Sequence, residues 1–368
     1  MTPPKHPAQE PVPQTSGQSP ASLLLYCRPG FEKETAAEIQ ALAATAGISG
    51  YVRTGHGSGY AEFCPCADAI DRLESVRFHD LIFARQLIVG RRSLTGLPPS
   101  DRIAPLIEAA RELFPGYCQV LLETADTDSA KTLSVFLRKF TPPFEQAFTS
   151  AGLMDPAAAQ RLHLFFLDSA SVRLGISRPG NSSPWAMGIP RLKFPRGAPS
   201  RSTLKLEEAF LHFLGADSPD LRPGMTAVDL GAAPGGWTWQ LVRRSIRVTA
   251  VDNGPMDPAL LESGIVQHLR ADGFRYRPAK PVDWLVCDMV EQPSRIADLV
   301  ARWLAEGHCR QAIFNLKLPM KKRYDEVCRC AGIIEERLAG AGLVHRLRFK
   351  QLYHDREEVT GWCGIASR

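Results

Sequence analysis

The sequence predicts an α/β protein in which a larger domain with a parallel, doubly wound sheet follows two small α/β modules. The 368 residues exceed the roughly 100–200 residues of one ordinary domain, so two or three domains are expected. From residue 200 onward, strand-like apolar runs alternate with helix-like segments, which is typical of a parallel sheet covered by helices on both faces. Between residues 22 and 89 the order is instead β-α-β-β-α-β, that of a ferredoxin-like unit.

Composition and charge restrict the class of protein. The chain is 44% hydrophobic and 23% charged, as ordinary globular proteins are, and its apolar runs fall short of the ~18 residues of a membrane span. The N-terminus lacks the basic and then apolar layout of a signal peptide, so we expect a cytoplasmic protein without a membrane partner. The formal net charge of +5 allows a nucleic-acid partner, and basic residues gather in two stretches, 191–205 and 317–323.

The nine cysteines form no pattern that predicts a metal site. Cys64 and Cys66 are separated by one residue, as are Cys328 and Cys330, and the two pairs lie far apart in the sequence. Zinc sites instead use two pairs with C-x2-C-like spacing. Disulfides are not expected in a reducing cytosol. We therefore expect neither a metal ion nor disulfides. Separately from the cysteine pattern, we expect a monomer.

The first 92 residues divide into a tail and a ferredoxin-like subdomain. Residues 1–20 are rich in proline, glutamine, serine and threonine, which cannot bury enough apolar surface to order themselves, so a disordered tail is expected. The subdomain covers 21–92, where apolar residues recur at strand and helix spacing. Its expected strands are 23–27, 51–53, 60–63 and 81–89, and its expected helices are 31–44 and 67–76.

Residues 93–178 form a second small module, which opens with a helix over 101–114 and Ser100 as its capping residue. The module has no glycine-rich phosphate loop and no pair of catalytic groups. We therefore expect an RNA-binding appendage, and a structural or dimerising appendage is the alternative. Its other expected helices are 129–140 and 144–151, and its expected strands are 119–123, 162–167 and 171–176.

A linker is expected over 179–199, because this stretch is rich in proline, glycine, serine and asparagine. Its basic residues suit a strap that contacts phosphates, and a plain solvated linker is the alternative. The domain 200–368 follows it. Its expected strands are 226–230, 248–251, 284–287, 312–316, 343–353 and 359–365, and its expected helices are 237–244, 295–304 and 324–338.

The strongest motif is Val-Asp-Leu-Gly-Ala-Ala-Pro-Gly-Gly-Trp at 228–237. A strand ends there in an acid and a glycine turn and then opens a helix, at the carboxyl end where doubly wound sheets bind ligands. Glycine lets a ligand approach the backbone closely. A dinucleotide fingerprint, G-x-G-x-x-G, is disfavoured because its second glycine is missing and Pro234 intervenes. A purely structural glycine turn is the alternative.

The form D-L-G-x-x-P-G-G resembles motif I of S-adenosylmethionine-dependent methyltransferases, particularly those of the FtsJ/RrmJ type. Asp252 ends an apolar strand some twenty residues later, where an acid can accept hydrogen bonds from both ribose hydroxyls of an adenosyl cofactor. Asp272 fits the acid that contacts the adenine amino group in methyltransferases, and a solvent-facing loop residue is the alternative. We therefore expect S-adenosyl-L-methionine as the cofactor.

Four charged residues form the candidate catalytic set. Asp288 ends a strand in Cys-Asp-Met-Val, which matches neither the N/D-P-P-Y/F of base amino-methyltransferases nor the Cys beside Pro of cytosine-C5 enzymes. Lys317 ends the next strand, where an unused charge beside a cleft would be costly. Lys205 lies on a helix, and Glu358 follows a late turn, with Glu357 as the alternative. Each of them alone is better interpreted as a surface charge.

Removal of the proton from a ribose 2'-hydroxyl would explain why these four charged residues occur together. This hydroxyl is a poor nucleophile, so a base must take its proton as it attacks a sulfonium methyl. A lysine can do so only if its pKa is depressed; nearby cations lower it, whereas a carboxylate raises it and orients the amine. We assign Lys317 as the base, Asp288 and Lys205 as residues that orient it and the hydroxyl, and Glu358 as the partner of Lys205. In-line positioning would supply the rest of the rate.

Five longer segments resemble the RlmM family, bacterial 2'-O-ribose methyltransferases of a cytidine in 23S ribosomal RNA. The resemblance spans about 22–366 and implies a THUMP-containing N-terminal region, a Rossmann-like catalytic domain, 23S ribosomal RNA as partner and Lys317 as proton acceptor. The segments are 27–34, 187–195, 199–210, 315–324 and 351–360. The cofactor-site residues that motif I and the resemblance imply are Ser202, Gly231, Ala233, Pro234, Gly235, Gly236, Asp252, Asp272 and Asp288.

Other functions share parts of this pattern. A 2'-O-methyltransferase of another RNA, such as tRNA, would carry the same motifs. A ribosome-assembly protein with an inactive domain is a different class, against which the intact glycine turn and the four polar residues argue. A nicotinamide dehydrogenase is disfavoured by the glycine spacing. The residues leave open the oligomeric state, and whether naked RNA or a precursor particle is the substrate.

Overall fold

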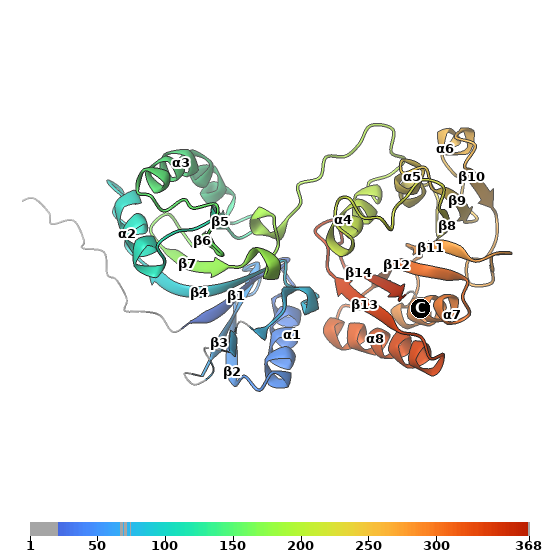
Figure 1. Cartoon of the computed structure of the whole chain (residues 1–368), viewed down its shortest axis with the longest axis horizontal. Helices are drawn as coiled ribbons and strands as arrows, with labels where there is room; N and C mark the ends of the chain where they lie inside the picture. Colours follow the sequence, from blue (N-terminus) through green and yellow to red (C-terminus); the bar gives the residue numbers. More distant parts are fainter. Residues whose placement is uncertain (1–20, 67–68, 70–71, 74, 367–368) are drawn as a thin grey trace, which may run out of the picture. The chain divides into compact units, whose positions relative to one another are not determined.

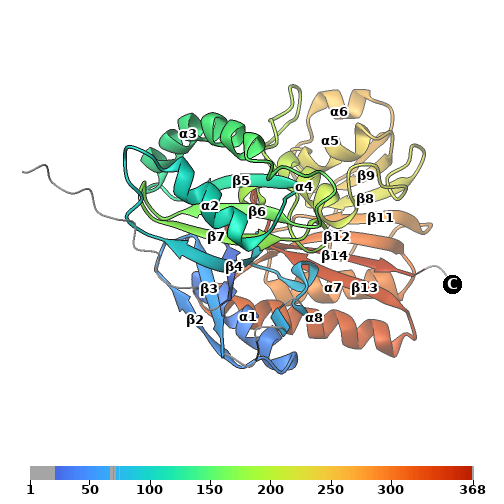
Figure 2. The same ribbon diagram turned by 60° about the vertical axis from the view of Figure 1, so that its left-hand side comes forward.

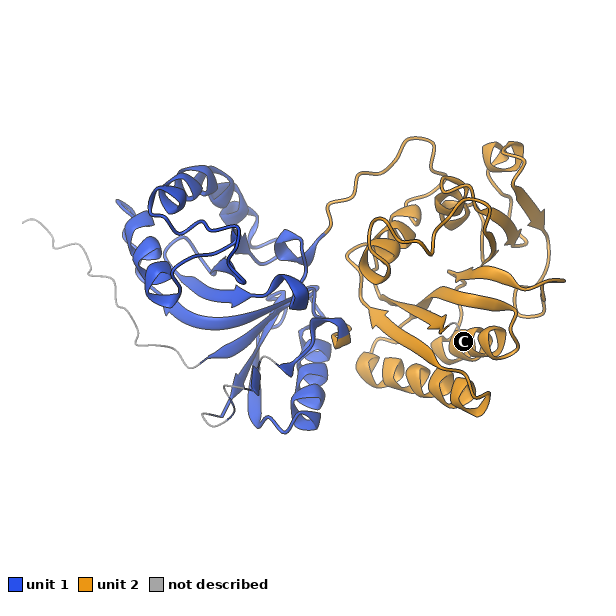
Figure 3. Cartoon of the chain, viewed as in Figure 1, with its two compact units in different colours: residues 1–79, 83–189 blue, residues 80–82, 190–368 orange. Residues whose placement is uncertain are grey.

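The computed structural model describes residues 21–366 except 67–68, 70–71 and 74 (Figure 1, Figure 2). The tail expected over 1–20 and part of the helix expected over 67–76 lie outside the described residues. The described chain forms two compact units (Figure 3): unit 1 ends at Ile189 and excludes Asp80–Ile82, and unit 2 contains that short segment and everything from Pro190 onward. The predicted α/β class is confirmed.

In the described residues, unit 1 is built on one seven-stranded sheet of order β2-β3-β1-β4-β7-β6-β5. The antiparallel pairing of β4 with β7 joins the strands of both predicted modules into this sheet, with a bulge between Gly90 and Arg92. The expected boundary between 92 and 93 therefore falls inside a strand of a continuous sheet. The strands are β1 (Ser22–Tyr26), β2 (Gly50–Thr54), β3 (Tyr60–Pro65), β4 (Gln86–Leu94), β5 (Gln119–Thr124), β6 (Arg161–Phe166) and β7 (Val172–Ser177).

Helices of unit 1 cover the sheet: α1 (Glu32–Thr45) packs on β2 and β3, α3 (Lys131–Ser150) packs on β5, and α2 (Ile103–Leu113) packs on α3. Side chains of β6 alternate between the two faces, because successive residues of a strand point to opposite sides. Leu162, Leu164 and Phe166 accordingly join Phe144 and Phe148 of α3 in one core.

Three local expectations in unit 1 were wrong. The helices expected on either side of Pro142 and Pro143 are one continuous helix, α3, because its apolar face is held in the core although two backbone donors are missing. The capping group of α2 belongs to Asp101, whose Oδ1 accepts from the amides of Ile103 and Ala104, and not to Ser100. Strand β4 begins at residue 86 rather than 81, where its register with β1 starts with Gln86 opposite Tyr26.

The first half of the expected linker is bound to unit 1. Ser183 donates its amide to Gln86 Oε1 and Met187 donates its amide to Glu123 Oε1. The freely connecting part is therefore shorter than 179–199. Glu123 also accepts from Tyr26 and contacts His163 Nδ1 at 2.8 Å, so the polar groups of this sheet face are paired with one another.

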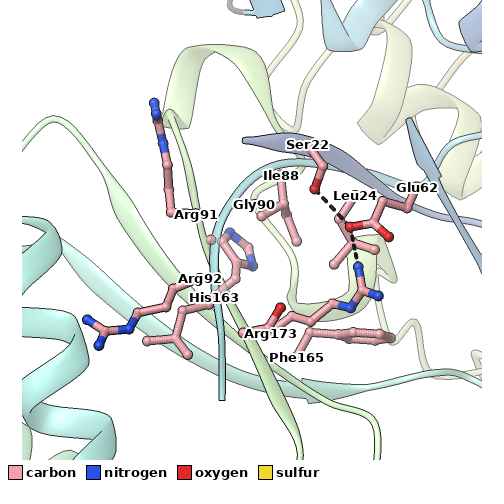
Figure 4. Close-up of a pocket in the computed structure, with 13 residues that line it drawn as sticks. Ser22, Leu24, Glu62, Ile88, Gly90, Arg91, Arg92, His163, Phe165 and Arg173 are labelled. Atoms are coloured by element: carbon pink, nitrogen blue, oxygen red, sulfur yellow. Dashed lines mark hydrogen bonds and ion pairs between the residues drawn. The ribbon is translucent and has the colours of Figure 1, made fainter. Parts of the chain in front are cut away.

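A small cavity of about 20 Å³ lies on this face (Figure 4), large enough for about one water. Glu62 lines it and binds both Ser22 and Arg173, as the dashed lines in Figure 4 show. His163 and Phe165 of β6 line it as well. Because the acid there is already paired, this cavity offers no open catalytic group.

Unit 2 also contains a seven-stranded sheet within the described residues, of order β10-β9-β8-β11-β12-β14-β13. Strands β10, β9, β8, β11 and β12 are parallel, and β14 runs antiparallel to both β12 and β13. The sheet is therefore mixed at one edge, whereas a parallel sheet was expected. After β13 the chain returns over residues 351–357, and β14 pairs with β13 as an antiparallel hairpin. The strands are β8 (Thr226–Leu230), β9 (Arg247–Val251), β10 (Val266–Leu269), β11 (Val282–Cys287), β12 (Cys309–Lys317), β13 (His345–Lys350) and β14 (Glu358–Ile365).

Helices cover both faces of this sheet (Figure 1), as expected for a doubly wound domain. On one face, Phe210 and Trp237 pack with Trp284 of β11 in a buried core. On the other face α7 packs on β12 and on α8, and its Trp303 is fully buried. The helices are α4 (Thr203–Phe213), α5 (Gly236–Val242), α6 (Pro258–Glu262), α7 (Pro293–Ala305) and α8 (Arg323–Gly340). Throughout the described ranges, the helices are too short or too polar to cross a membrane.

Candidate active site

Four charged side chains meet at the carboxyl edge of the parallel strands of unit 2. Asp288 follows the last residue of β11, Lys317 is the last residue of β12, and Glu358 is the first residue of β14. Because β14 is antiparallel to β12, its first residue pairs with the last residue of β12, and Glu358 lies opposite Lys317. Lys205 reaches the same place from the first turn of α4. The four residues that the sequence singled out are therefore brought together.

The two carboxylates bridge the two ammonium groups. Lys317 Nζ lies 2.7 Å from Glu358 Oε1 and 3.2 Å from Asp288 Oδ1. Lys205 Nζ lies 2.9 Å from Glu358 Oε1 and 3.7 Å from Asp288 Oδ2. All four side chains are largely buried, which strengthens their mutual attraction relative to surface pairs. The cluster is compact enough for one residue to set the protonation of another.

The carboxylates dominate the protonation of the cluster. Burial by itself lowers the pKa of Lys317, but the negative charge of Asp288 and the hydrogen bond that Lys317 donates to Glu358 outweigh it, so the pKa lies above its ordinary value. Burial likewise raises the pKa of Glu358, but hydrogen bonds from Lys317, the Arg356 amide and Lys205 lower it to about 2. The sequence led us to expect a depressed pKa for Lys317. In the protein without cofactor or RNA this pKa is raised instead, since Asp288 and Glu358 are both acids.

Glu357 and Glu358, which the sequence left as alternatives, point to different partners. Glu357 Oε2 accepts from Arg323 Nη2 at 2.6 Å and is half exposed. Glu358 Oε2 accepts from the Arg356 amide while its Oε1 faces the two lysines. Of these two neighbours, Glu358 is therefore the one whose carboxylate contacts the cluster.

The glycine turn between β8 and α5 is closely packed from several sides. Gly231 has φ +79°, and a Cβ there would lie 2.8 Å from the Met289 side chain. Gly235 has φ +116°, and its Cβ would lie 2.2 Å from Leu260. Only glycine tolerates these combinations of conformation and space. Ala233 and Pro234, joined by a cis peptide bond, lie between these two glycines.

Ser202 and Asp252 border the same turn. A Cβ on Gly236 would lie 2.2 Å from Ser202 Oγ, so the loop before α4 touches the start of α5. Asp252 follows β9 and accepts from the amides of Ala233 and Gly254, at 3.0 and 2.7 Å. A carboxylate has about four acceptor positions, so Asp252 keeps capacity for two further donors.

Asp272 lies farther along this edge and is half exposed. Its Oδ1 accepts from the Phe274 amide, and its Oδ2 lies 3.5 Å from Arg275 Nε. The adjacent Gly273 is buried, and a Cβ there would lie 2.8 Å from Met289 Sδ. The segment after β10 therefore lies against the loop that carries Asp288.

Two polar residues at this edge were missed as site residues by the sequence reasoning. Asn315 donates from Nδ2 to Asp288 Oδ1 at 2.9 Å. It precedes Lys317 by two residues on β12, so strand alternation alone places both on one face and could have identified it. Asp229, the acid of the glycine motif, is fully buried and accepts from Thr238 Oγ1 at 2.7 Å.

Groups of three or more potential ligands suited to a metal ion are absent from the residues that the structure describes. The thiols of Cys287, Cys309 and Cys363 are buried, and burial raises the pKa of each above its ordinary value. Cys287 in particular is a packed strand residue beside Asp288. None of these three thiols is therefore poised as a nucleophile.

Family models match three parts of the chain. The model described as RlmM ferredoxin-like domain matches residues 21–88. The model described as ribosomal RNA large subunit methyltransferase M, N-terminal, matches 101–178, and that described as FtsJ-like methyltransferase matches 198–310. The last match begins just before α4 and includes the glycine turn, Asp252, Asp272 and Asp288.

Curated relatives resemble the chain over nearly its whole length. A protein named ribosomal RNA large subunit methyltransferase M from Methylococcus capsulatus is 61% identical over 352 residues, which are 95% of this chain and 99% of that protein. Proteins of the same name from Cellvibrio japonicus and Aromatoleum aromaticum are 54% and 50% identical, over 93% and 96% of this chain and 99% and 97% of theirs. The resemblance inferred from the motifs is confirmed, and the chain belongs to the ribosomal RNA large subunit methyltransferase M family.

Proposed function

We propose that this methyltransferase transfers a methyl group from S-adenosylmethionine to the ribose 2'-hydroxyl of a cytidine in 23S ribosomal RNA, with Lys317 as proton acceptor. The observation that carries the proposal is the convergence of Lys205, Asp288, Lys317 and Glu358 beside the glycine turn. A lysine–carboxylate cluster matches proton removal from an alcohol. The choice of cytidine and of 23S RNA rests on membership of the family, and a cytoplasmic location follows from that substrate.

The residues around the glycine turn fit an adenosyl cofactor. The turn brings bare backbone to the carboxyl edge, as close approach of a ligand requires. Asp252 keeps two acceptor positions, which matches the two hydroxyls of a ribose, and Asp272 offers an exposed carboxylate beyond it. We assign Ser202, Ala233, Pro234 and the glycines 231, 235 and 236 to the walls of this site.

Proton transfer would use the lysine cluster as follows. When bound, S-adenosylmethionine supplies a methyl group on a positively charged sulfur. Lys317 Nζ, in its neutral form, would accept the 2'-hydroxyl proton as the ribose oxygen takes the methyl group. Asp288 and Glu358 would orient the amine, and Lys205 would limit the rise that they cause in its pKa, because Lys205 competes for the same carboxylates. A second cation near the amine favours the neutral form that a base needs.

A methyl-transfer assay with a Lys317→Ala variant tests the proposal. Labelled S-adenosylmethionine and 23S RNA lacking modifications are incubated with the parent protein, with Lys317→Ala, and with Lys280→Ala as a matched control, since Lys280 is exposed on another loop. We expect 2'-O-methylcytidine with the parent and the control, and a loss of about 10³-fold or more with Lys317→Ala, as for removal of a general base.

The other outcomes decide between the alternatives. Label on a base, or undiminished label with Lys317→Ala, would overturn the proposed chemistry. Cofactor binding without label in 23S RNA would reject this substrate and favour another RNA or an assembly role. Binding of S-adenosylmethionine by Lys317→Ala, measured by calorimetry, separates loss of chemistry from loss of folding.

A further inference from the structure

A buried chain of hydrogen bonds leads from the cluster of Lys205, Asp288, Lys317 and Glu358 into the interior of unit 2. Asn315 on β12 and Thr360 on β14 are directly paired across the two strands, so their side chains lie on one face. Thr360 Oγ1 lies 2.7 Å from Asn315 Oδ1 and 3.0 Å from Asp355 Oδ2. Asn315 Nδ2 in turn lies 2.9 Å from Asp288 Oδ1. The three residues Asn315, Thr360 and Asp355, which we call the relay, are at most 1% exposed.

The direction of each hydrogen bond follows from the chemistry of the groups. Asp288 faces two lysines and is an acceptor, so the Asn315 amide must turn its NH2 toward it and its oxygen toward Thr360. The single hydroxyl hydrogen of Thr360 must then go to Asn315 Oδ1. Thr360 Oγ1 also lies 3.3 and 3.0 Å from the two carboxyl oxygens of Asp355, and one hydroxyl hydrogen does not fully satisfy both Asn315 and Asp355. A protonated carboxyl of Asp355 would supply the missing hydrogen, because it can donate to the Thr360 oxygen.

The surroundings of Asp355 agree with a neutral acid. Its Oδ2 accepts from the Leu352 amide, and its carboxyl is 1% exposed. Among the charged groups that act on it are Lys205 and Glu208 of α4 and Glu358 of β14. Burial raises its pKa well above the ordinary value; the hydrogen bond from the Leu352 amide and the charge of Lys205 oppose this rise, and Glu208 and Glu358 add to it.

We propose that Asp355 is a neutral carboxylic acid that positions the catalytic carboxylate of Asp288 through Thr360 and Asn315. The inference rests on the proposed function. Asn315 and Lys317 share one oxygen, Asp288 Oδ1, so donation by Asn315 reduces the negative charge that Lys317 experiences. The relay thus holds Asp288 in place and keeps the pKa of Lys317 from rising further. Thr360 and Asp355 touch neither substrate nor cofactor and are positioning residues.

Isosteric variants separate this role from a merely structural one. Thr360→Val removes the hydroxyl and leaves Asn315 Oδ1 without its donor, so we expect kcat to fall about tenfold and the rise of kcat with pH to shift to higher pH. Thr360→Ser keeps the hydroxyl and should restore both. Asp355→Asn can still donate an N–H to Thr360 and accept from Leu352, so its kcat should stay within about twofold, whereas Asp355→Leu should resemble Thr360→Val.

The results that would overturn the proposal are distinct from failure of the proposed function. An unchanged pH profile in Thr360→Val, or equal losses in Asp355→Asn and Asp355→Leu, would refute the relay while the parent stays active and Lys317→Ala stays inactive. An active Lys317→Ala would instead refute the proposed base. The affinity for S-adenosylmethionine should be equal in parent and variants.

A measurement on the parent protein reports the protonation state of Asp355 directly. The 13C resonance of the Asp355 carboxyl, assigned by its disappearance in Asp355→Asn, should keep the chemical shift of a protonated acid from pH 5 to pH 8. A shift typical of an ionised carboxylate at pH 6 would overturn the assignment of Asp355 as a neutral donor.

Discussion

At the scale of single residues, the candidate site is a balance of two ammonium groups and two carboxylates within hydrogen-bond reach. Glu358 Oε1 contacts both lysines, so the charge of one lysine is felt by the other through a shared partner. Removing either acid would leave two buried cations with a single carboxylate between them, which is costly. The same arrangement explains why the protein alone keeps Lys317 protonated: its acids outweigh its burial.

The pH dependence of methylation should reflect this protonation. Because the pKa of Lys317 is raised, the neutral amine is a minor species at neutral pH, and its fraction grows about tenfold per pH unit below that pKa. We expect kcat, measured at saturating substrates, to rise with pH from 6 to 9. A kcat that is flat over this range would contradict Lys317 as the base or place another step in control of the rate.

The buried acid of the glycine motif should make stability depend on pH. Burial, with smaller contributions from Asp288 and Asp252, raises the pKa of Asp229 from 3.8 to about 7 against the hydrogen bond from Thr238. Between these values the folded chain holds a proton that the unfolded chain has lost, so this residue's contribution to stability falls as pH rises.

Asp229→Asn should remove that loss. We expect the difference in free energy of unfolding, Asp229→Asn minus parent, to increase by up to about 1.4 kcal/mol per pH unit between about pH 4 and 7. Above pH 7 this difference should stay constant. Urea unfolding at several pH values measures the difference. Asp217→Asn is the matched control, because Asp217 is exposed and should produce no slope.

At the scale of secondary-structure elements, side chains and packing decided where helices begin and how far they continue. The sequence predicted Ser100 as the capping residue of α2, but Asp101 accepts from the two amides at its start. It also offered two prolines as a break, but α3 continues through them because Phe144 and Phe148 lie in the core on the same helix face as Leu137.

The choice of cap can be measured directly. Asp101→Ala removes the acceptor for two amides at the start of α2 and should lower the free energy of unfolding by about 1 kcal/mol. Ser100→Ala should change it by less than about 0.5 kcal/mol, as at an ordinary surface position. Equal effects of the two substitutions in chemical denaturation would contradict Asp101 as the cap.

At the scale of the whole molecule, two units with separate sheets and cores divide the chain. The site residues all belong to unit 2. In the sheet of unit 1, Glu123 is paired with Tyr26 and His163, and Glu62 is paired with Arg173. The residues that leave unit 1 after Ile189 carry Arg191, Lys193 and Arg196, in a mostly exposed stretch. This stretch is either a phosphate-contacting strap or a plain connection.

Salt dependence of RNA binding distinguishes these two roles. Replacing Arg191, Lys193 and Arg196 by Gln should reduce the slope of log affinity against log salt by about 0.7–0.9 for every phosphate that the protein no longer neutralises, with unchanged affinity for S-adenosylmethionine. Filter binding of a 23S RNA fragment at several salt concentrations measures the slope. An unaltered slope would identify a plain solvated linker, and Lys280→Gln serves as the control for general loss of charge.

The sequence by itself determined the α/β class, most strand positions, the glycine turn and the four charged residues of the candidate site. These features are local: apolar alternation and turn residues mark a strand end, and a charge at a strand end stands out against its neighbours. The same alternation could have identified Asn315, two residues before Lys317, but no local pattern indicated Thr360 or Asp355.

Only the tertiary structure decided which distant residues meet. The pairing of β4 with β7 made one sheet of two predicted modules, and the insertion of β14 between β12 and β13 placed Glu358 opposite Lys317. That placement also reversed the expected shift in the pKa of Lys317, since two carboxylates surround its amine. The physical reason is that register and charge environment depend on contacts between segments far apart in the chain, which no local pattern of residues encodes.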